Sequence, residues 1–385
     1  MKIVINALSA LRGGGQTYLI NLLRELKKLD YECSVVVISN SNNINIFEEF
    51  QSENVEIVNS SFASRNIIFR VLWEVFYLPF FLSKVHAKSY YAPGGVMVTL
   101  MPSGCKSYTA LRNMLPFDER ERKRFPLFSY IRFKLWILKH VFLVSYRMSD
   151  HVIFISNYSK EVVKSYYLGV EEKSKTIYHG INEHFLKSEQ ESTELPFGLI
   201  VGEYYLYVSI LDVYKAQKEV VQSWIEMSAA GNTKPLILVG PKYNEYGEEV
   251  IHMINADSSN TIRYVGPVEY DKLPTLYHSA RGLVFASSCE CCPNIMLEKL
   301  ASGRPVISSN IMPMPEFGKE SVIYFDPYKE GSLKKAVETL ESADNLNRYS
   351  SLSSSRASDF GWKQTASDTF LFLMEKNSAK ENEHV

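Results

Sequence analysis

Residues 287–310, SSCECCPNIMLEKLASGRPVISSN, decide the fold of this chain. The run GLVFASS (282–288) just before is typical of a buried parallel strand, and Pro293 suits the first position of a helix. This order places Glu290 on a loop and Glu298 about one and a half turns inside the helix. The spacing therefore predicts that both carboxylates face one crevice beyond the carboxyl end of the strand.

The predicted crevice suits a ligand with a diphosphate between two sugars. Open α/β sheets bind ligands at the carboxyl ends of their strands. The first helical N–H groups, at Asn294 and Ile295, have no intrahelical acceptor, so we expect them to point at an anion. A carboxylate one turn deeper accepts hydrogen bonds from sugar hydroxyls. We therefore expect a nucleotide-sugar.

The same stretch resembles the E-x7-E signature of the family-4 retaining glycosyltransferases, usually ESFGLPLLEAMACGxPVIAS. Glu290 and Glu298 keep the spacing, residues 301–309 keep the turn and strand, and Cys-Pro-Asn-Ile (292–295) replaces FGLP. The resemblance covers nearly the whole chain. It implies the α/β GT-B fold: two Rossmann-like, doubly wound parallel-sheet domains facing a cleft, with the donor in the C-terminal domain and the acceptor in the N-terminal one.

Length and composition agree with two globular domains. The chain has 385 residues, 46% of them hydrophobic and 22% charged. A polar stretch containing Pro196 marks the linker. We expect an acceptor domain at 1–187, a linker at 188–198, a donor domain at 199–360, a C-terminal helix packing back toward the first domain at 361–375, and a tail at 376–385.

A glycine loop follows the first predicted strand. Gly13, Gly14 and Gly15 allow a ligand to approach the backbone, but their spacing is not G-x-G-x-x-G, which argues against a dinucleotide-dependent dehydrogenase. The resemblance implies contact with the donor diphosphate. In the second domain the family text GRLxxxKG becomes SILDVYKA (209–216), so Lys215 keeps the lysine and Ile210 replaces the arginine. Arg304 and Arg112 are candidates to supply the missing charge.

Two features of the first domain bear on the acceptor. Where many family members have a His-Asp pair beside the donor sugar, this chain has Arg112-Asn113, which suits a phosphate or carboxylate and gives no general base. Residues 119–148 carry eight basic and two acidic residues among many aromatics, which favours an anionic membrane surface; a helix packed on its own domain is the competing interpretation. No nucleic-acid motif accompanies this charge. The apolar run 66–84 predicts a helix that Pro79 interrupts.

By resemblance, Glu298 binds the ribose and Glu290 orients the donor sugar. Lys215, the glycine loop and the backbone N–H groups near Pro293, Asn294 and Ile295 stabilise the departing diphosphate. Retention needs no enzyme nucleophile. We expect no cofactor and no metal ion, since no Asp-x-Asp motif occurs and the cysteines at 289, 291 and 292 lack zinc spacing.

The sequence thus predicts a retaining, metal-independent hexosyltransferase that uses a UDP- or GDP-linked sugar. We expect a saccharide acceptor, lipid-linked, in the synthesis of a bacterial surface polysaccharide such as O-antigen or capsule. No signal peptide or spanning apolar run is seen, so we expect a cytoplasmic protein at the inner face of the membrane. Two alternatives stay open: an epimerase of the same fold, and a nucleotide-sugar-binding protein without catalytic activity.

Overall fold

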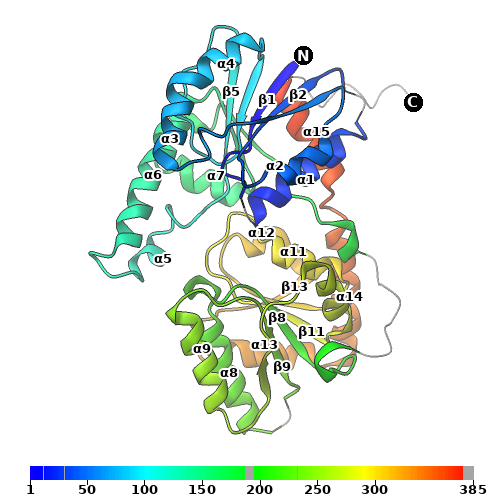
Figure 1. The fold of residues 1–385 in the computed structure, drawn as a ribbon. Helices are drawn as coiled ribbons and strands as arrows, with labels where there is room; N and C mark the ends of the chain where they lie inside the picture. The colour runs from blue at the N-terminus through cyan, green and yellow to red at the C-terminus, as the bar shows by residue number, and fades with distance from the viewer. Residues whose placement is uncertain (12, 30, 187–194, 232, 376–385) are drawn as a thin grey trace. The chain divides into compact units, whose positions relative to one another are not determined.

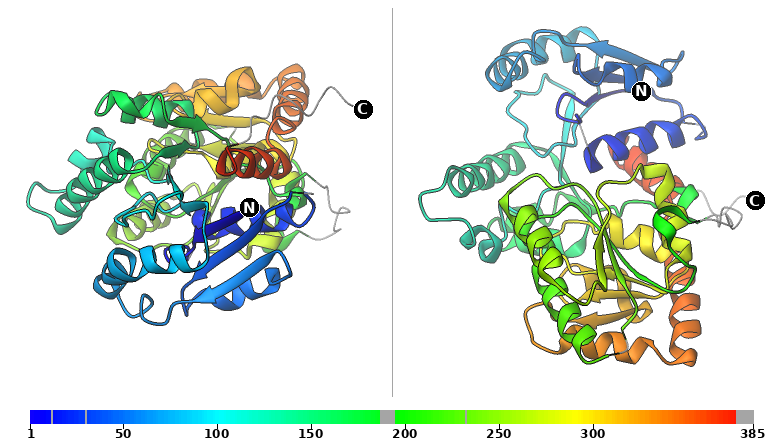
Figure 2. Two further views of the ribbon diagram at one scale, coloured as in Figure 1. Left: turned by 90° about the horizontal axis from the view of Figure 1, so that it is seen from above. Right: turned by 60° about the horizontal axis from the view of Figure 1, so that its bottom comes forward.

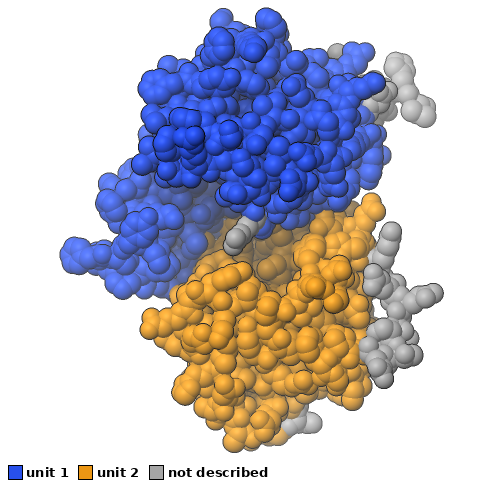
Figure 3. Space-filling model, viewed as in Figure 1, with its two compact units in different colours: residues 1–180, 362–385 blue, residues 181–361 orange. Residues whose placement is uncertain are grey.

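The computed structural model describes residues 1–11, 13–29, 31–186, 195–231 and 233–375. They form two compact units, unit 1 (residues 1–180 and 362–385) and unit 2 (residues 181–361), coloured separately in Figure 3. The chain thus leaves unit 1 at residue 180, earlier than the expected boundary at 187. Most of the expected linker 188–198 and the whole expected tail 376–385 lie outside the described residues.

Unit 1 is built on a seven-stranded parallel sheet in the order β3-β2-β1-β4-β5-β6-β7 (Figure 1). Its strands are β1 (Lys2–Asn6), β2 (Ser34–Ser39), β3 (Val55–Asn59), β4 (Ser89–Ala92), β5 (Lys106–Leu111), β6 (His151–Phe154) and β7 (Ser174–Thr176). Its helices are α1 (Gly14–Leu26), α2 (Ile44–Phe47), α3 (Ile67–Leu72), the π-helical turn η2 (Trp73–Tyr77), α4 (Leu78–Lys84), α5 (Glu119–Lys123), α6 (Tyr130–Met148), α7 (Asn157–Lys164) and α15 (Trp362–Leu373).

Alternating side chains of β1 divide the core of unit 1 between the two faces of the sheet. Ile3 and Ile5 are buried with apolar residues of α1 and α15, including Phe370. Val4 is buried on the opposite face with Leu78 and Leu82 of α4. Figures 1 and 2 show α15 beside α1 in each view. The C-terminal helix therefore completes the core of the unit that the N-terminus begins.

Unit 2 holds a six-stranded parallel sheet in the order β10-β9-β8-β11-β12-β13, with helices on both faces (Figure 1). Its strands are β8 (Tyr205–Val208), β9 (Leu236–Val239), β10 (Ile262–Tyr264), β11 (Gly282–Phe285), β12 (Val306–Ser309) and β13 (Val322–Phe325). Its helices include η6 (Val213–Lys215), α8 (Gln217–Ala229), α9 (Glu245–Ala256), η7 (Tyr270–Lys272), α10 (Leu273–Ser279), α11 (Asn294–Ala301), α12 (Met314–Gly318), α13 (Ser332–Leu340) and α14 (Ala343–Ala357). The prediction of two Rossmann-like, doubly wound parallel sheets is confirmed.

The prediction that Pro79 interrupts the helix of 66–84 is wrong. The segment stays helical because a π-helical turn precedes the proline, and the Leu78 N–H donates to the Trp73 carbonyl five residues back. Pro79 then stands in the first turn of α4, where a missing N–H is tolerated. None of the helices within the described residues is both long and apolar enough to cross a membrane.

Candidate functional site

The strand order of unit 2 reverses between β8 and β11, which are hydrogen-bonded neighbours. The chain runs from β8 outward to β9 and β10, then returns to place β11 on the other side of β8. Such a switch point is where open α/β sheets bind ligands, outside the carboxyl ends of the strands. The loops that follow β8 and β11 carry Lys215 and Glu290, so both residues lie at this point.

Lys215 and Glu290 form an ion pair. Nζ of Lys215 contacts Oε1 of Glu290, and Ser287 Oγ donates to the same oxygen at 2.7 Å. Both side chains are largely buried. Lys215 is held by the short helix η6, whose start Asp212 caps by accepting the Val213 N–H. The sequence predicted each residue at the donor site separately; the structure joins them.

Helix α11 begins at Asn294, as the position of Pro293 predicted. The expectation that the Asn294 amide points at an anion is wrong, because its N–H donates to the Cys292 carbonyl at 2.9 Å. Of the two N–H groups expected to contact an anion, that of Ile295 is the one that remains a candidate.

Glu298 lies at the end of a short hydrogen-bonded chain. The Tyr270 hydroxyl donates to its Oε1 at 2.8 Å and accepts from Asn182 Nδ2 at 2.9 Å. Burial raises the pKa of Glu298 to about 7, opposed by the Tyr270 hydrogen bond and by the charge of Lys299. Glu298 and Glu290 thus have different partners, and Glu298 is poised to change charge near neutral pH.

Lys299 is a buried cation that the sequence reasoning missed. Its side chain is fully buried, and Nζ donates to the Val208 carbonyl at 3.3 Å. The ammonium lies 5.1 to 6.0 Å from the ring centroids of Tyr207, Tyr277 and Phe285. Burial lowers the pKa of Lys299 to about 7. The signal in the sequence was a lysine within an otherwise apolar helical face.

Lys299 lies close to Lys215. Its ammonium and that of Lys215 both lie beside the Phe285 ring, at 5.6 and 5.5 Å from its centroid. Arg304, one of the residues considered for compensation, instead donates through Nε to the His278 carbonyl. Arg112, the other, belongs to unit 1.

The glycine loop lies in unit 1, at the start of α1. Gly13 caps the helix with φ of 63°, a left-handed conformation that favours glycine, and Gly14 and Gly15 already belong to the helix. A Cβ added at Gly13 or Gly15 would meet no atom within 4 Å. The loop is therefore open to a ligand, as the predicted diphosphate contact requires.

Arg112 is packed among neutral groups of unit 1. Its guanidinium lies 3.4 Å from the ring centroid of Tyr18 and donates to Tyr91 Oη at 3.2 Å. It also lies 3.1 Å from Nε2 of His179, which must accept because a guanidinium only donates. Asn113 Oδ1 accepts the Leu115 N–H at 3.2 Å.

Segment 119–148 contains α5 and α6. The inner side of α6 is buried in unit 1 through Leu135, Phe142, Leu143 and Tyr146. Its amino-terminal half exposes Tyr130, Phe133 and Trp136, and the preceding Phe128 is 97% exposed. The helix therefore packs on its own domain and also presents aromatic residues to solvent.

Cys289, Cys291 and Cys292 are buried, as are Cys33 and Cys105. Within the described part of the chain, no group of three or more His, Cys, Asp or Glu side chains is placed to hold a metal ion.

Family models match both units. A model described as Glycosyltransferase Family 4 matches residues 12–185, and one described as Glycosyl transferases group 1 matches residues 202–342. The chain belongs to the family-4 glycosyltransferases. Solved structures agree with the fold: a Rickettsia africae glycosyltransferase (TM-score 0.72, 15% identity) and Anabaena HepE in complex with UDP and glucose (TM-score 0.71, 16% identity). The first covers 97% of this chain and 98% of its own, the second 97% and 100%.

Curated relatives of this family-4 chain are named for O-antigen assembly. The O-antigen chain mannosyltransferase RfbU of Salmonella typhimurium is 25% identical over 57% of each chain. The O-antigen chain mannosyltransferase B of Escherichia coli is 25% identical over 43% of this chain and 44% of its own. The chain thus spans about half the length of the curated relatives it matches.

Proposed function

We propose that this family-4 protein transfers a hexose from a UDP- or GDP-linked donor to a saccharide acceptor, with retention of configuration, during assembly of a surface polysaccharide. The observation that carries the proposal is the Lys215–Glu290 ion pair at the β8/β11 switch point. The relatives named O-antigen mannosyltransferases support a mannosyl donor, and the neighbour solved with UDP supports a nucleoside diphosphate.

Each residue of the site has a defined part in this proposal. Lys215 and the Ile295 amide offset the charge that develops on the departing diphosphate, which is electrostatic preorganisation. Glu290, oriented by Ser287, accepts hydrogen bonds from the donor sugar, and Glu298 accepts them from the ribose. The leaving phosphate takes the acceptor proton on the same face of the sugar, so neither an enzyme nucleophile nor a resident metal ion takes part.

We propose further that the acceptor is lipid-linked and that the protein binds the inner face of an anionic membrane. The exposed aromatic residues of α6 and the basic charge of 119–148 support this surface. Exposed apolar side chains of the α3–η2–α4 segment, including Ile67, Ile68, Phe76 and Phe80, add to it.

A thermal-shift screen against UDP-, GDP-, ADP- and dTDP-sugars tests the donor assignment. We expect one nucleotide class to raise the melting temperature of the wild-type protein, and Glu298→Ala to remove the shift. Transfer of radiolabelled sugar from that donor to lipid extracts then tests the activity. If no nucleotide shifts the wild-type protein, the donor site is assigned wrongly; binding without transfer would leave a sugar-nucleotide-binding protein.

A further inference from the structure

An apolar cavity of about 620 Å³ lies in unit 1, at the carboxyl end of the edge strand β3. Val58 and Asn59, the last residues of β3, and the serines at 60 and 61 form one wall. The remaining lining is Phe62, Leu72, Trp73, Phe76, Tyr77 and Phe81. The size and the aromatic lining are those of small-molecule sites, and no lining residue is charged. The part of a ligand that enters is therefore apolar.

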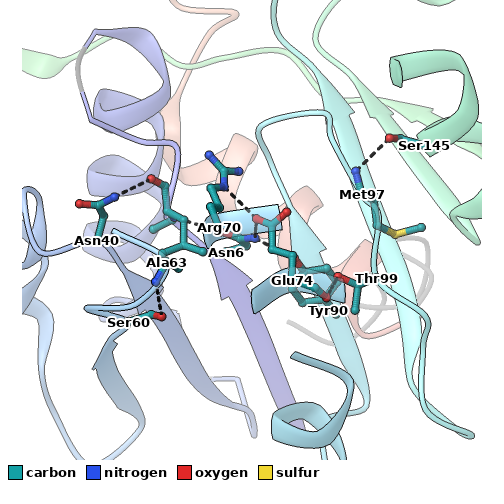
Figure 4. A network of polar contacts seen from close by, with 12 residues as sticks. Asn6, Asn40, Ser60, Ala63, Arg70, Glu74, Tyr90, Met97, Thr99 and Ser145 are labelled. Atoms are coloured by element: carbon teal, nitrogen blue, oxygen red, sulfur yellow. Dashed lines mark hydrogen bonds and ion pairs between the residues drawn. The ribbon is translucent and has the colours of Figure 1, made fainter. Parts of the chain in front are cut away.

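The π-helical turn that forms the second wall is fixed from below by a buried polar network (Figure 4). Glu74 is 2% exposed and accepts hydrogen bonds from Asn6 Nδ2 at 3.0 Å and Arg70 Nε at 2.9 Å. Its backbone carbonyl accepts from Thr99 Oγ1 at 2.7 Å. The network anchors the turn and leaves Trp73, Phe76 and Tyr77 free to line the cavity. Single π turns inside α-helices are frequent at functional sites.

A cation stands at the rim of the cavity. The Arg65 guanidinium lies 5.6 Å from the ring centroid of Phe62, a lining residue, and 5.5 Å from that of Phe69. No carboxylate within the described residues forms an ion pair with Arg65. Outside the cavity, Ile67, Ile68 and Phe80 are more than 60% exposed. An apolar chamber with a cationic rim and an apolar approach is complementary to an amphiphile with an anionic head group.

We propose that this cavity holds the first hydrocarbon units of the acceptor's lipid carrier, with Arg65 on the phosphate that joins the carrier to its saccharide. The inference rests on the proposed function, in which the acceptor is lipid-linked. A bulk phospholipid keeps its chains in the bilayer and needs no protein cavity for them. A carrier must be drawn partly out so that its saccharide reaches the reaction, and the carboxyl edge of the sheet is where a ligand of an α/β domain binds.

Calorimetry with farnesyl phosphate, kept monomeric and free of detergent, tests the proposal. We expect the wild-type protein to bind one equivalent and Ser61→Trp, which fills the cavity from an exposed loop position, to bind at least about tenfold more weakly. Arg65→Ala should bind farnesyl phosphate more weakly, with an affinity close to that for farnesol, which lacks the phosphate. The matched control is Leu168→Ser, which removes an exposed apolar side chain of unit 1 outside the cavity and should bind the probe as the wild type does.

Circular dichroism establishes that each variant is folded. If Ser61→Trp does not fold, Leu72→Trp fills the cavity from another wall. The proposal is overturned if the wild type does not bind farnesyl phosphate, or if folded cavity-filling variants bind it unchanged. It is also overturned if the cavity-filling variants lose binding to phosphatidylglycerol vesicles but still bind farnesyl phosphate as the wild type does. Nucleotide-sugar thermal shifts on the same proteins separate this inference from the proposed function. If a nucleotide-sugar still raises the melting temperature but farnesyl phosphate does not bind, only the lipid-carrier inference is contradicted.

Discussion

At the scale of single residues, the consecutive pair Glu298 and Lys299 gives the proposed donor site two groups that titrate near neutral pH. Burial raises the pKa of Glu298 and lowers that of Lys299, each to about 7. Below that pH the lysine is charged and the carboxyl is protonated. Both changes on raising the pH make the local charge more negative, which opposes a bound diphosphate.

We therefore predict that nucleotide-sugar affinity falls as the pH rises from 6 to 8.5, by about tenfold, or about 1.4 kcal/mol. A nucleotide-sugar is the right probe because its diphosphate is a diester that does not titrate in this range. In Lys299→Met the affinity at pH 6 should drop part of the way toward the wild-type value at pH 8.5, because Glu298 stays protonated at pH 6. Titration calorimetry at several pH values measures both effects.

The other ionisable groups facing Lys299 are Lys215 and the phenols of Tyr207 and Tyr277, whose pKa values burial raises far above neutrality. Glu298→Gln removes the remaining group that titrates near 7. If the affinity of Lys299→Met for the nucleotide-sugar changes with pH as much as that of the wild type, the lysine does not contribute to the pH dependence. Because Met replaces a buried charge without an ion-pair partner, its melting temperature at pH 6 should be equal to or above that of the wild type.

Lys215 gives a second prediction at this scale. Lys215→Met removes the cation nearest the proposed leaving group and leaves Glu290 buried without its ion pair. We expect kcat for sugar transfer to fall by about 100-fold or more, with a smaller change in KM, because the charge is needed most in the transition state. Lys335→Met, an exposed change on α13, is the control. A rise in KM at unchanged kcat would assign Lys215 to ground-state binding instead.

The sequence indicated which loop or helix carries Lys215, Glu290 and Glu298, because strand, loop and helix signals are local. It did not predict the Lys215–Glu290 pair, because the two loops meet only when β8 and β11 become neighbours across the sheet. Lys299 was missed because a lysine is normally assigned to solvent, and only the packed rings around it show otherwise.

At the scale of elements, α6 and the residues just before it carry the proposed membrane surface. Its carboxyl-terminal half is anchored in unit 1, while Phe128 and Phe133 are 97% and 59% exposed. We predict that Phe128→Ser with Phe133→Ser weakens binding to phosphatidylglycerol vesicles about tenfold or more without changing the melting temperature, because the side chains are exposed in the folded protein. Vesicle co-sedimentation measures this.

Salt and lipid charge provide the controls for that surface. Binding of the wild type should weaken at 0.5 M salt and on neutral phosphatidylcholine vesicles, since basic side chains contribute about 1 kcal/mol each near an anionic surface. Equal binding of the double variant would mean that α6 is not the membrane contact.

Element boundaries were predicted well where a local signal exists. Helix α11 begins next to Pro293, the residue that indicated its start in the sequence. The helix across Pro79 was misjudged because the π turn that accommodates the proline depends on the network beneath Glu74. That network includes Asn6 of strand β1, almost seventy residues away, so no local sequence pattern predicts it.

At the scale of the whole molecule, the alternation of strands and helices predicted two doubly wound sheets, since parallel strands need crossover connections. The point at which the chain leaves unit 1 was placed too late. The strands of both units have similar sequence patterns, so the unit to which a segment belongs is decided by what it packs against. The C-terminal helix α15 belongs to unit 1 through side chains such as Phe370 and Leu373, which are buried with residues of α1.

Two units with separate cores should unfold in separable steps. Phe370 in α15 and Leu340 in α13 are both fully buried, the first in unit 1 and the second in unit 2. We predict that Phe370→Ala costs unit 1 about 3–5 kcal/mol and that Leu340→Ala costs unit 2 about 2–5 kcal/mol, because each leaves a cavity. In scanning calorimetry each variant should lower a different transition, and a bound nucleotide-sugar should raise only the one that Leu340→Ala lowers. If both variants lower a single shared transition, the two cores unfold cooperatively and α15 links the stability of one unit to the other.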